Sequence, residues 1–377
     1  MSLLHCIPSL AGGGAERQLI YLVQGLLERG WAVSVATARK GQNCDRLSET
    51  GVKIHWIDAR SSYHPSILSR LRRIVRNEEP NIVQTWLLQM DIAGGLAARV
   101  AGVPWILSER SSAHLYPGGL KYRLREALAR GATAIVSNSE GGRAYWEARI
   151  GTRIPQRVIP NGLPLGEIKE VQSVRSEDVG LRDDDQVILF VGRRSPEKNI
   201  DALLLACRTV LKRDSRVVAF CGEGFAMDQE IRLFARDLPS NCVRVLGYIP
   251  DVWRWMKRAS ALVSVGFCEG RPNAVLEAMA CGCPVVVSDI PAHREFLDET
   301  CAVLVNARDA ISIARGLEQC LTDRHSASLR AGKARELVGQ WTIERMVEHY
   351  EEFYAEVMGS NGRSGESPIN HYRVRGV

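Results

Sequence analysis

The sequence predicts an α/β protein made of two Rossmann-like, doubly wound domains with parallel sheets, and two observations support this class. Short apolar runs alternate with amphipathic stretches over residues 3–159, and after a polar stretch the same alternation restarts at residue 187. Such an alternation is typical of parallel sheets that carry helices on both faces. With 377 residues, the chain is long enough for two domains with ordinary cores.

The first domain is expected over residues 1–165. Its predicted strands are apolar runs at residues 3–7, 31–37, 52–57, 82–85, 105–108, 132–137 and 157–159. Amphipathic stretches predict helices between several of them, at residues 16–28, 65–77, 90–101 and 121–130. The turn pair Asn161-Gly162 and the polar stretch that follows indicate the end of this domain.

The second domain is expected over residues 166–341. Its predicted strands are residues 187–191, 217–221, 243–246, 261–265 and 285–287, and its predicted helices are residues 200–212, 227–238 and 252–258. Residues 342–358 predict a final amphipathic helix, which can cross back to the first domain. Residues 359–377 are rich in Gly, Ser and Arg, a composition that favours a flexible tail.

The composition favours a cytoplasmic protein. Hydrophobic residues make up 45% and charged residues 24% of the chain, as in ordinary globular domains. The first ten residues lack the basic start and the long apolar run of a signal peptide, and no uncharged apolar run approaches the length of a bilayer span. The ten cysteines are scattered without C-x-x-C spacing, which predicts a reducing compartment and no structural metal.

The net charge is divided unequally between the two halves. Residues 1–165 hold 21 Lys and Arg against 12 Asp and Glu, a net charge of +9, whereas the remaining residues hold 28 against 31, a net charge of −3. A basic half indicates an anionic partner for the first domain. A chance bias of surface residues is the alternative.

Two glutamates, Glu269 and Glu277, stand eight positions apart after the predicted strand at residues 261–265. Pro272 suits a first helical residue and Gly282 a left-handed helix end, so Glu269 is expected in a loop and Glu277 inside a helix. The carboxyl end of a strand is where open α/β sheets bind ligands. Two carboxylates there suit a ligand with many hydroxyl groups. Taken alone, they can also be ordinary solvated charges.

Two loops are candidates for binding phosphate. Residues 12–17, Gly-Gly-Gly-Ala-Glu-Arg, follow the first strand and open a helix, where backbone N–H groups can approach an anion. The loop fits neither the dinucleotide fingerprint nor the P-loop, so a tight turn without a ligand stays open. In residues 192–199, Arg193 and Lys198 share a strand-to-helix loop and can clamp two phosphates, unless the loop is simply an exposed charged one.

The segment from Glu269 to Val286 resembles the E-x7-E motif of retaining glycosyltransferase family 4, which has the GT-B architecture. The resemblance implies two Rossmann-like domains that face each other across a cleft. It also implies transfer of a sugar from a nucleotide donor to an acceptor hydroxyl with retention at the anomeric carbon. In the family the first glutamate lies by the donor sugar and the second by the ribose, which implies these places for Glu269 and Glu277.

The two glycine-containing loops match the same family. Residues 12–17 resemble the loop that closes over the donor diphosphate, and residues 192–198 match the Gly-Arg-x4-Lys signature, in which Arg193 and Lys198 stabilise the departing nucleoside diphosphate. Residues 222–224 and 246–252 resemble segments near the nucleoside. The positions implied for donor binding are Gly13, Gly14, Gly192, Gly222, Tyr248, Arg271, Pro272, Asn273 and Glu277.

The first domain is expected to hold the acceptor. Asp91 follows the strand at residues 82–85 and can contact the acceptor or act as a helix N-cap. Many relatives carry a histidine shortly before this position, where this chain has Gln89 and Met90. His114, after the next strand, is therefore our candidate for a polar contact to the sugar or the acceptor hydroxyl. His5 and His55, within strands, are expected in the core.

The implied reaction needs no cofactor and no metal, because no Asp-x-Asp motif stands at a strand end and Arg193 and Lys198 can stabilise the leaving group. The donor is expected to be linked to UDP or GDP and to carry a hexose or an N-acetylhexosamine. The acceptor is expected to be a carbohydrate or a lipid-linked glycan, and no nucleic-acid partner is expected. A glycoside hydrolase that uses Glu269 and Glu277, and a nucleotide-sugar-binding protein without catalysis, are the alternatives.

Two basic stretches of the first domain indicate contact with a membrane surface. Residues 66–76 carry four arginines beside apolar residues at helical spacing, and residues 121–130 add a second basic stretch. A basic face of this kind can lie against anionic lipid on the cytoplasmic side. The alternative is an ordinary solvated helix surface.

Overall fold

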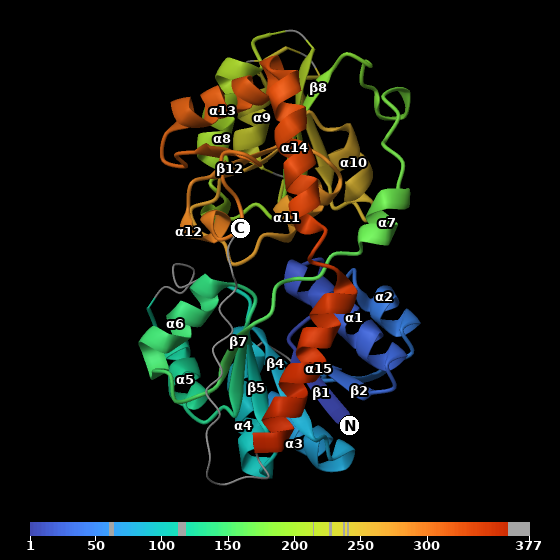
Figure 1. Cartoon of the computed structure of the whole chain (residues 1–377), viewed down its shortest axis with the longest axis vertical. Coiled ribbons are helices and arrows are strands. Elements are labelled where there is room, and N and C mark those ends of the chain that lie inside the picture. Colours follow the sequence, from blue (N-terminus) through green and yellow to red (C-terminus); the bar gives the residue numbers. More distant parts are fainter. Residues whose placement is uncertain are drawn as a thin grey trace.

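The computed structural model describes residues 1–59, 64–111, 118–213, 215–225, 228–236, 238–239 and 241–360, without the side chain of residue 360. Figure 1 shows two α/β lobes, one above the other, with the last helix lying across the lower lobe. The lower lobe contains the amino terminus. Within the described residues, no helix is long and apolar enough to cross a membrane.

The first lobe is built on a seven-stranded parallel sheet with the strand order β3-β2-β1-β4-β5-β6-β7. Its strands are β1 (Ser2–Ile7), β2 (Ala32–Thr37), β3 (Lys53–Trp56), β4 (Ile82–Trp86), β5 (Trp105–Glu109), β6 (Ala134–Ser137) and β7 (Gln156–Val158). Its helices are α1 (Gly14–Glu28), α2 (Cys44–Glu49), α3 (Ser66–Glu78), α4 (Leu87–Ala101), α5 (Leu120–Ala129) and α6 (Glu140–Ile150).

The second lobe is built on a six-stranded parallel sheet with the order β10-β9-β8-β11-β12-β13. Its strands are β8 (Gln186–Val191), β9 (Arg216–Cys221), β10 (Val243–Gly247), β11 (Ala261–Ser264), β12 (Val285–Ser288) and β13 (Val303–Val305). Its helices are α7 (Leu165–Glu170), α8 (Ile200–Val210), α9 (Gln229–Arg236), α10 (Val252–Arg258), α11 (Asn273–Ala280), α12 (Pro291–Arg294), α13 (Ala310–Thr322) and α14 (Arg324–Val338).

The inner strands of both sheets are buried on both faces, as their near-continuous apolar sequences predict. In β1, Leu3 and Ile7 pack into one core cluster while Leu4 and Cys6 pack into the cluster on the opposite face. The same division holds in β8, where Val187 packs into one core cluster and Ile188 into the cluster on the opposite face. The predicted α/β class with two Rossmann-like parallel sheets is therefore confirmed.

The strand orders reverse at two points, between β1 and β4 in the first sheet and between β8 and β11 in the second. A crevice opens at the carboxyl ends of the strands at such a switch point, because the helices that follow leave toward opposite faces. Residues 12–14 follow β1, residues 192–199 follow β8, and Glu269 follows β11. The chain thus brings its candidate loops to the switch points of both sheets.

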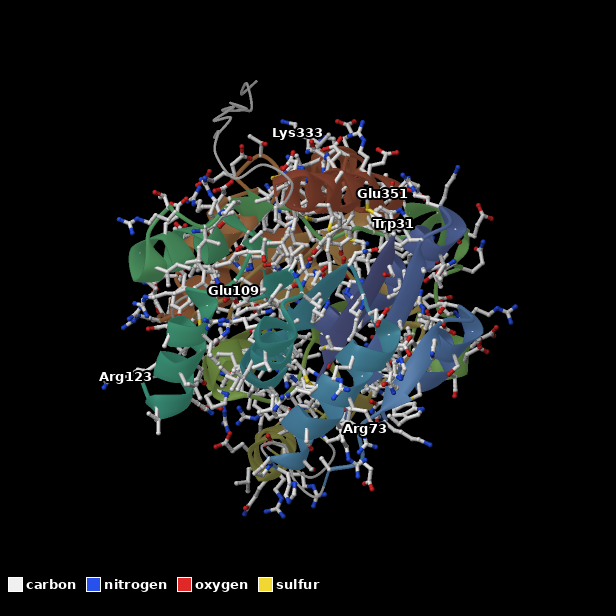
Figure 2. The ribbon with its side chains drawn as sticks, turned by 90° about the horizontal axis from the view of Figure 1, so that it is seen from below. Trp31, Arg73, Glu109, Arg123, Lys333 and Glu351 are labelled. Carbon is white, nitrogen blue, oxygen red and sulfur yellow. The ribbon has the colours of Figure 1, made fainter. Side chains whose placement is uncertain are left out.

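The last helix, α15 (Ile343–Ser360), packs on the first lobe although it follows the second in sequence. Its buried residues Met346, Tyr350 and Phe353 belong to the core cluster that contains Leu19 of α1. The indole nitrogen of Trp31 donates a hydrogen bond of 2.6 Å to a carboxylate oxygen of Glu351 on α15, and Figure 2 labels both residues. Burial of each large apolar side chain stabilises this crossover by about 1.5–3 kcal/mol.

Three local expectations were wrong. Pro272 has an extended backbone with ψ near 105° and precedes α11 instead of starting it. His55 is only half-buried, because its ring Nε2 lies 3.5 Å from a carboxylate oxygen of Glu78. Asp91 is not a helix N-cap, because α4 begins at Leu87. His5 does lie in the core, where burial lowers its pKa to about 3.

Candidate active site

The loops that follow β8 and β11 are tied together at the switch point of the second sheet. The backbone N–H of Phe267 donates to the carbonyl oxygen of Glu197 at 2.9 Å. The Asn199 amide donates to the carbonyl oxygen of Val265 at 3.0 Å, and Asn199 takes the left-handed backbone that starts α8. These bonds fix where Lys198 stands relative to the loop that carries Glu269.

Lys198 and Glu269 form an ion pair across this switch point. The ammonium Nζ of Lys198 lies 2.7 Å from Oε1 of Glu269, whose residue is only 7% exposed. A carboxylate that is buried to this extent is stable when a cation neutralises it. The pair presents a positive and a negative group side by side at the sheet edge, where a ligand with phosphates and hydroxyl groups can use both.

The two arginines of the same loop differ in their surroundings. Arg193 is exposed and interacts electrostatically with Glu16 and Glu197. Arg194 forms ion pairs with Asp228 at 2.6 Å and Asp201 at 2.9 Å, and with Glu230. Arg194 therefore holds its own loop in place, while the guanidinium of Arg193 faces solvent.

The glycines at the ends of β8 and β9 let these two loops pack closely. Gly222 has φ near +137°, and a Cβ there would collide with the backbone of Gly192. Only glycine tolerates both the positive φ and the contact. The N–H of Gly192 donates to the carbonyl oxygen of Cys221 at 2.9 Å, which continues the strand pairing into the loops.

The glycine loop of the first lobe lies directly against the second lobe. A Cβ at Gly12 would stand 2.7 Å from the ring of Tyr248, and one at Gly14 would stand 2.6 Å from the side-chain nitrogen of Asn273. The Asn273 amide donates to the carbonyl oxygen of Gly14 at 3.2 Å and accepts from the Asn161 amide at 2.6 Å. Gly13 lies between these two contacts. The glycine loop therefore packs on Tyr248 and Asn273 of the second lobe, and Glu16 beside it interacts electrostatically with Arg193 of the other predicted phosphate loop.

Glu277 on α11 is 4% exposed and is held by two donors. The guanidinium of Arg17 donates through Nη2 at 2.6 Å and Nη1 at 3.2 Å, and the indole N–H of Trp253 donates at 2.9 Å. Sequence reasoning assigned no role to Arg17 or Trp253. Arg17 belongs to the recognised glycine loop, so its charge was visible, but its partner 260 positions away was not.

A second carboxylate links the lobes on the other side of the junction. The carboxylate of Glu295 accepts from the backbone N–H groups of Glu140 at 3.0 Å and Gly141 at 2.7 Å. These are the unpaired N–H groups at the start of α6, where a negative charge is also favoured by the helix dipole. Glu295 thus acts as an N-terminal cap supplied by the other lobe.

Arg271 differs from its predicted place at the donor. Its guanidinium lies 5.1 Å from the ring centre of Phe296 and 4.2 Å from that of Trp341, and burial lowers its pKa to about 10. Its backbone carbonyl oxygen accepts a hydrogen bond of 3.2 Å from Asn161. The side chain therefore supports the crossover near Trp341, and the backbone of residues 271–273 is what borders the glycine loop.

His293 is a buried polar residue that the sequence reasoning missed. Its ring Nδ1 lies 2.7 Å from the carbonyl oxygen of Ser288, and it interacts electrostatically with Glu269 and Lys198. Burial lowers its pKa, so the ring is neutral and Nδ1 carries the hydrogen. Its Nε2 is left without a hydrogen-bond partner among the described residues. His293 lies in the four-residue helix α12, whose short polar sequence gives no signal for this placement.

Asp91 does not reach the junction. It is fully buried, and its carboxylate accepts from Arg125 at 2.8 Å and from the Thr85 hydroxyl at 2.7 Å, while Nη1 of Arg125 lies 2.9 Å from Glu109. Burial raises the pKa of Asp91 to about 6. The structure therefore gives Asp91 a structural role in a three-residue ion cluster. His114 lies outside the described residues.

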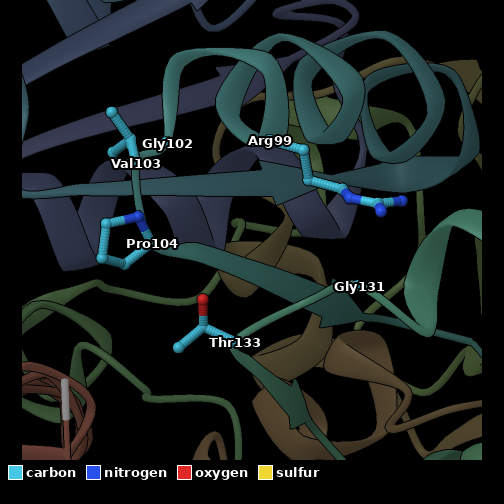
Figure 3. Close-up of a pocket in the computed structure, with 6 residues that line it drawn as sticks. All are labelled: Arg99, Gly102, Val103, Pro104, Gly131 and Thr133. Atoms are coloured by element: carbon cyan, nitrogen blue, oxygen red, sulfur yellow. The ribbon is translucent and has the colours of Figure 1, made fainter.

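A separate shallow hollow of about 320 Å³ lies at the opposite edge of the first sheet (Figure 3). Its lining consists of Arg99, Gly102, Val103, Pro104, Gly131 and Thr133. Val103 and Thr133 precede β5 and β6, so the hollow is at the amino ends of the strands, whereas open α/β sheets bind ligands at the carboxyl ends. Among the described residues, no group of three or more His, Cys, Asp and Glu side chains is arranged to hold a metal ion.

Comparison with known proteins identifies relatives along most of the chain. The chain is 28% identical to the lipopolysaccharide core biosynthesis glycosyltransferase LpsE of Rhizobium meliloti over 343 residues, which cover 90% of this chain and 94% of that protein. It is 23% identical to the UDP-Gal:alpha-D-GlcNAc-diphosphoundecaprenol alpha-1,3-galactosyltransferase of Escherichia coli over 311 residues, covering 77% of this chain and 79% of that one.

Solved structures share the fold. The crystal structure of Anabaena HepE in complex with UDP and glucose superimposes with a TM-score of 0.83 at 18% identity, covering 94% of this chain and all of that chain. Two family models match consecutive parts of the sequence, Glycosyltransferase Family 4 over residues 12–167 and Glycosyl transferases group 1 over residues 172–337. The chain belongs to glycosyltransferase family 4, the group 1 glycosyl transferases, and is a glycosyltransferase with the GT-B fold.

Proposed function

We propose that this enzyme transfers a hexose or an N-acetylhexosamine from a UDP-linked donor to an acceptor hydroxyl, with retention at the anomeric carbon and without a metal ion. The observation that carries the proposal is the Lys198–Glu269 ion pair at the switch point, in a loop whose Arg193 interacts electrostatically with Glu16 of the first lobe. The pair combines the two groups that a nucleotide sugar needs, a cation for its phosphates and a carboxylate for its sugar hydroxyls.

The chemical demand is to stabilise a departing diphosphate. In the proposed reaction the bond between the anomeric carbon and the phosphate oxygen breaks, and a new bond forms to the acceptor oxygen on the same face of the sugar. The departing phosphate oxygen takes the proton of the acceptor hydroxyl. Lys198, Arg193 and the backbone N–H groups of the glycine loop can stabilise the growing negative charge, an effect that is large where water is excluded.

Two relatives support a UDP-linked donor. The Escherichia coli relative carries UDP-Gal in its name, and HepE was crystallised with UDP. Lys198 and Arg193 contact a diphosphate in the same way for any base, so the base has to be read elsewhere. Tyr248, which is exposed beside Gly12, and the backbone around it are our candidates for that contact.

A glycoside hydrolase fits the site less well. Such an enzyme needs one protonated carboxyl group as its acid. Here Glu269 is paired with an ammonium group and Glu277 with a guanidinium group, so neither carboxyl group is free to act on a glycosidic oxygen. A nucleotide-sugar donor also explains the predicted phosphate-binding loops, because a hydrolase has no phosphate to bind.

Release of the nucleoside diphosphate tests the proposal. Purified enzyme is incubated with UDP-glucose, UDP-galactose, UDP-GlcNAc, UDP-GalNAc and the GDP-linked sugars, and free UDP or GDP is measured. We expect release from a UDP-linked sugar, faster with acceptor present and unchanged by excess chelator. Release that needs added Mg²⁺ or Mn²⁺ would contradict the metal-free mechanism, and hydrolysis of a simple glycoside without nucleotide would favour the hydrolase.

We further propose that the acceptor is lipid-linked and that the first lobe binds the cytoplasmic face of a membrane. Arg72, Arg73 and Arg76 of α3 are exposed, as is Arg123 of α5, and Figure 2 shows Arg73 and Arg123 pointing outward from the rim of the first lobe. Leu120, the first residue of α5, is 84% exposed. Protruding apolar residues among basic ones are typical of surfaces that lie against anionic lipid.

The second basic stretch is smaller than predicted. Arg125 is buried in the cluster with Asp91 and Glu109, so three of the four cations predicted in residues 121–130 stay exposed, namely Lys121, Arg123 and Arg130. The diphosphoundecaprenol acceptor in the name of the Escherichia coli relative supports a lipid-linked acceptor for this enzyme as well. The enzyme can bind a lipid-linked glycan only at the surface of the bilayer that holds the lipid.

A further inference from the structure

The Glu277 carboxylate is occupied by the other lobe. Arg17, on α1 of the first lobe, approaches both of its oxygens, with Nη2 to Oε1 at 2.6 Å and Nη1 to Oε2 at 3.2 Å. The pair is well shielded, since the side chains of Arg17 and Glu277 are 21% and 5% exposed. Arg17 also interacts electrostatically with Tyr21 and Tyr248. Its guanidinium therefore lies among the groups proposed to surround the nucleoside.

The geometry leaves little room for a second ligand on this carboxylate. An ionised carboxylate offers about four acceptor positions on its two oxygens. Arg17 uses one position on each oxygen, and the indole N–H of Trp253 uses another on Oε2 at 2.9 Å. A ribose diol that bound in the same two-pronged way would need both oxygens. Arg17 and the diol therefore compete for Glu277, while Trp253 can keep the carboxylate oriented in either case.

The competing contact also joins the two lobes. Arg17 is four positions after Gly13, in the helix whose first turn packs against Asn273 of the second lobe. Release of Arg17 from Glu277 removes a charged, two-pronged contact between the lobes and leaves the contacts of Asn273 in place. Binding of a ribose to Glu277 would thus remove one of the contacts that hold the glycine loop of the first lobe against the second lobe.

We propose that Arg17 masks the ribose-binding carboxylate of the empty enzyme and that a nucleoside must displace it, so that Arg17 sets nucleoside affinity and transmits ribose binding to the glycine loop. The inference rests on the proposed function, because it takes Glu277 as the ribose ligand. It gives Arg17 a role that opposes nucleoside binding, whereas an ordinary ligand residue would promote it.

Nucleoside binding measured by titration calorimetry tests this role. Uridine and guanosine carry the ribose diol without phosphates, so they report on the masked carboxylate and not on the phosphate loops. The variants are Arg17→Met, which removes the guanidinium but keeps the aliphatic stem, and Arg17→Lys, which keeps the charge but not the two-pronged geometry. The matched control is Arg46→Met, because Arg46 lies over the ring of Tyr21, with which Arg17 interacts electrostatically, and its own ion pair is with Glu167 at 3.6 Å and not with Glu277.

Arg17→Met should bind the nucleoside about 3- to 10-fold more tightly than wild type, because the unpaired carboxylate gains donors from the ribose. Arg17→Lys should gain less, and Arg46→Met should match wild type. In a Glu277→Gln background, Arg17→Met should cause no further gain, since the coupling between the two residues is then gone.

Equal or weaker nucleoside binding by Arg17→Met would overturn the masking role and make Arg17 a plain structural or ligand residue. The same holds if the gain persisted in the Glu277→Gln background. UDP and GDP are titrated alongside as the check on the proposed function. If neither bound to the wild-type enzyme, the proposed function would fail, and the role of Arg17 would fail with it.

Discussion

The carboxyl edges of the two sheets share one topology but use their charged residues in opposite ways. At the edge of the second sheet, Lys198 and Glu269 follow β8 and β11, and Glu277 lies in the second turn of α11 next to the interdomain junction. At the edge of the first sheet, Asp91 and Glu109 are fully buried around Arg125. A charged residue near the carboxyl end of a parallel strand is therefore a ligand candidate only when its ion pair lies at the interdomain junction. An ion pair inside the core of one lobe cannot contact a ligand.

The difference has a physical cause. A nucleoside diphosphate presents the same phosphates and ribose to every enzyme that binds it, so the groups that hold it can stand at fixed spacing within a few short segments. An acceptor has no such constant part. The first lobe can therefore use charged residues to stabilise its own fold, as in the Asp91–Arg125–Glu109 cluster.

Removal of Arg125 should have the largest effect, and we expect that effect on the free energy of unfolding. Arg125→Met leaves two buried carboxylates without their cation, and the free energy of unfolding should drop by about 3–5 kcal/mol. Urea unfolding followed by circular dichroism measures it. Arg143→Met, which removes an exposed arginine paired with Glu140 at 2.7 Å, is the matched control and should cost less than about 1 kcal/mol. Equal losses in the two variants would remove the distinction between the two edges.

Removal of Lys198 should have the next largest effect, and we expect that effect on the rate of catalysis. Lys198→Ala should lose about 2–4 kcal/mol of transition-state stabilisation, seen as a lower kcat for release of the nucleoside diphosphate. The control is Lys212→Ala, an exposed lysine beyond the end of α8. Near-normal turnover by Lys198→Ala would show that this ion pair is as structural as the cluster of the first lobe.

The two glutamates of the second lobe should separate by role. Glu269→Gln should mainly lower kcat, because its carboxylate is expected beside the donor sugar. Glu277→Gln should mainly raise the dissociation constant of the nucleotide, by about 10-fold, as expected for loss of a charged hydrogen bond. Steady-state kinetics and calorimetry on both variants distinguish the two effects, and a reversal of the pattern would disprove the assignment.

The cluster of the first lobe should give stability an unusual pH dependence. Burial raises the pKa of Asp91 to about 6 in the folded protein, above the ordinary value of 3.8. The folded state then holds the proton more tightly, so this residue favours folding most below pH 4, and its contribution is lost as the pH rises from about 4 to 6. The stability of wild type relative to Asp91→Asn should fall across that interval in urea titrations. A constant difference would show that Asp91 keeps an ordinary pKa.

Charge removal on the rim of the first lobe should have the smallest effect per residue. Arg72→Ser with Arg73→Ser should weaken binding to anionic vesicles by about 1 kcal/mol per charge at low salt. Arg324→Ser with Lys333→Ser, two exposed cations of the second lobe, is the matched control and should bind as wild type does. Co-sedimentation measures both. Equal binding of wild type to neutral vesicles would leave the arginines as solubilising charge.

The sequence predicted much of the fold because parallel strands are apolar on both faces. The strands β1, β4, β8 and β9 each lie within one residue of their predicted bounds. The helix α6 was not predicted, because Gly141 and Gly142 in its first turn and a weak apolar stripe hide it. Ser139 caps the N–H of Gly142 locally, but the N–H groups of Glu140 and Gly141 are capped by Glu295 of the other lobe, which no local pattern can reveal.

The site was predictable where its chemistry lies within one segment. The phosphate loops and both glutamates were found from short motifs, and their roles remain predictions. Contacts between distant segments were not predictable: Arg17 meets Glu277 across 260 positions, and Asp91 meets Arg125 across 34. Arg271 was placed at the donor because its neighbours are there, whereas its long side chain turns toward Trp341.

The central claim is that the edge of the second sheet activates a UDP-linked sugar for transfer with retention. Proton NMR of the reaction in excess chelator, with an α-linked UDP-sugar from the release screen and its acceptor, tests it most directly. We predict a product whose new glycosidic bond is α-configured, formed together with one equivalent of UDP, and strongly reduced in Lys198→Ala. A β-configured product, or product formation that stops in chelator and resumes with added Mg²⁺, would contradict the account.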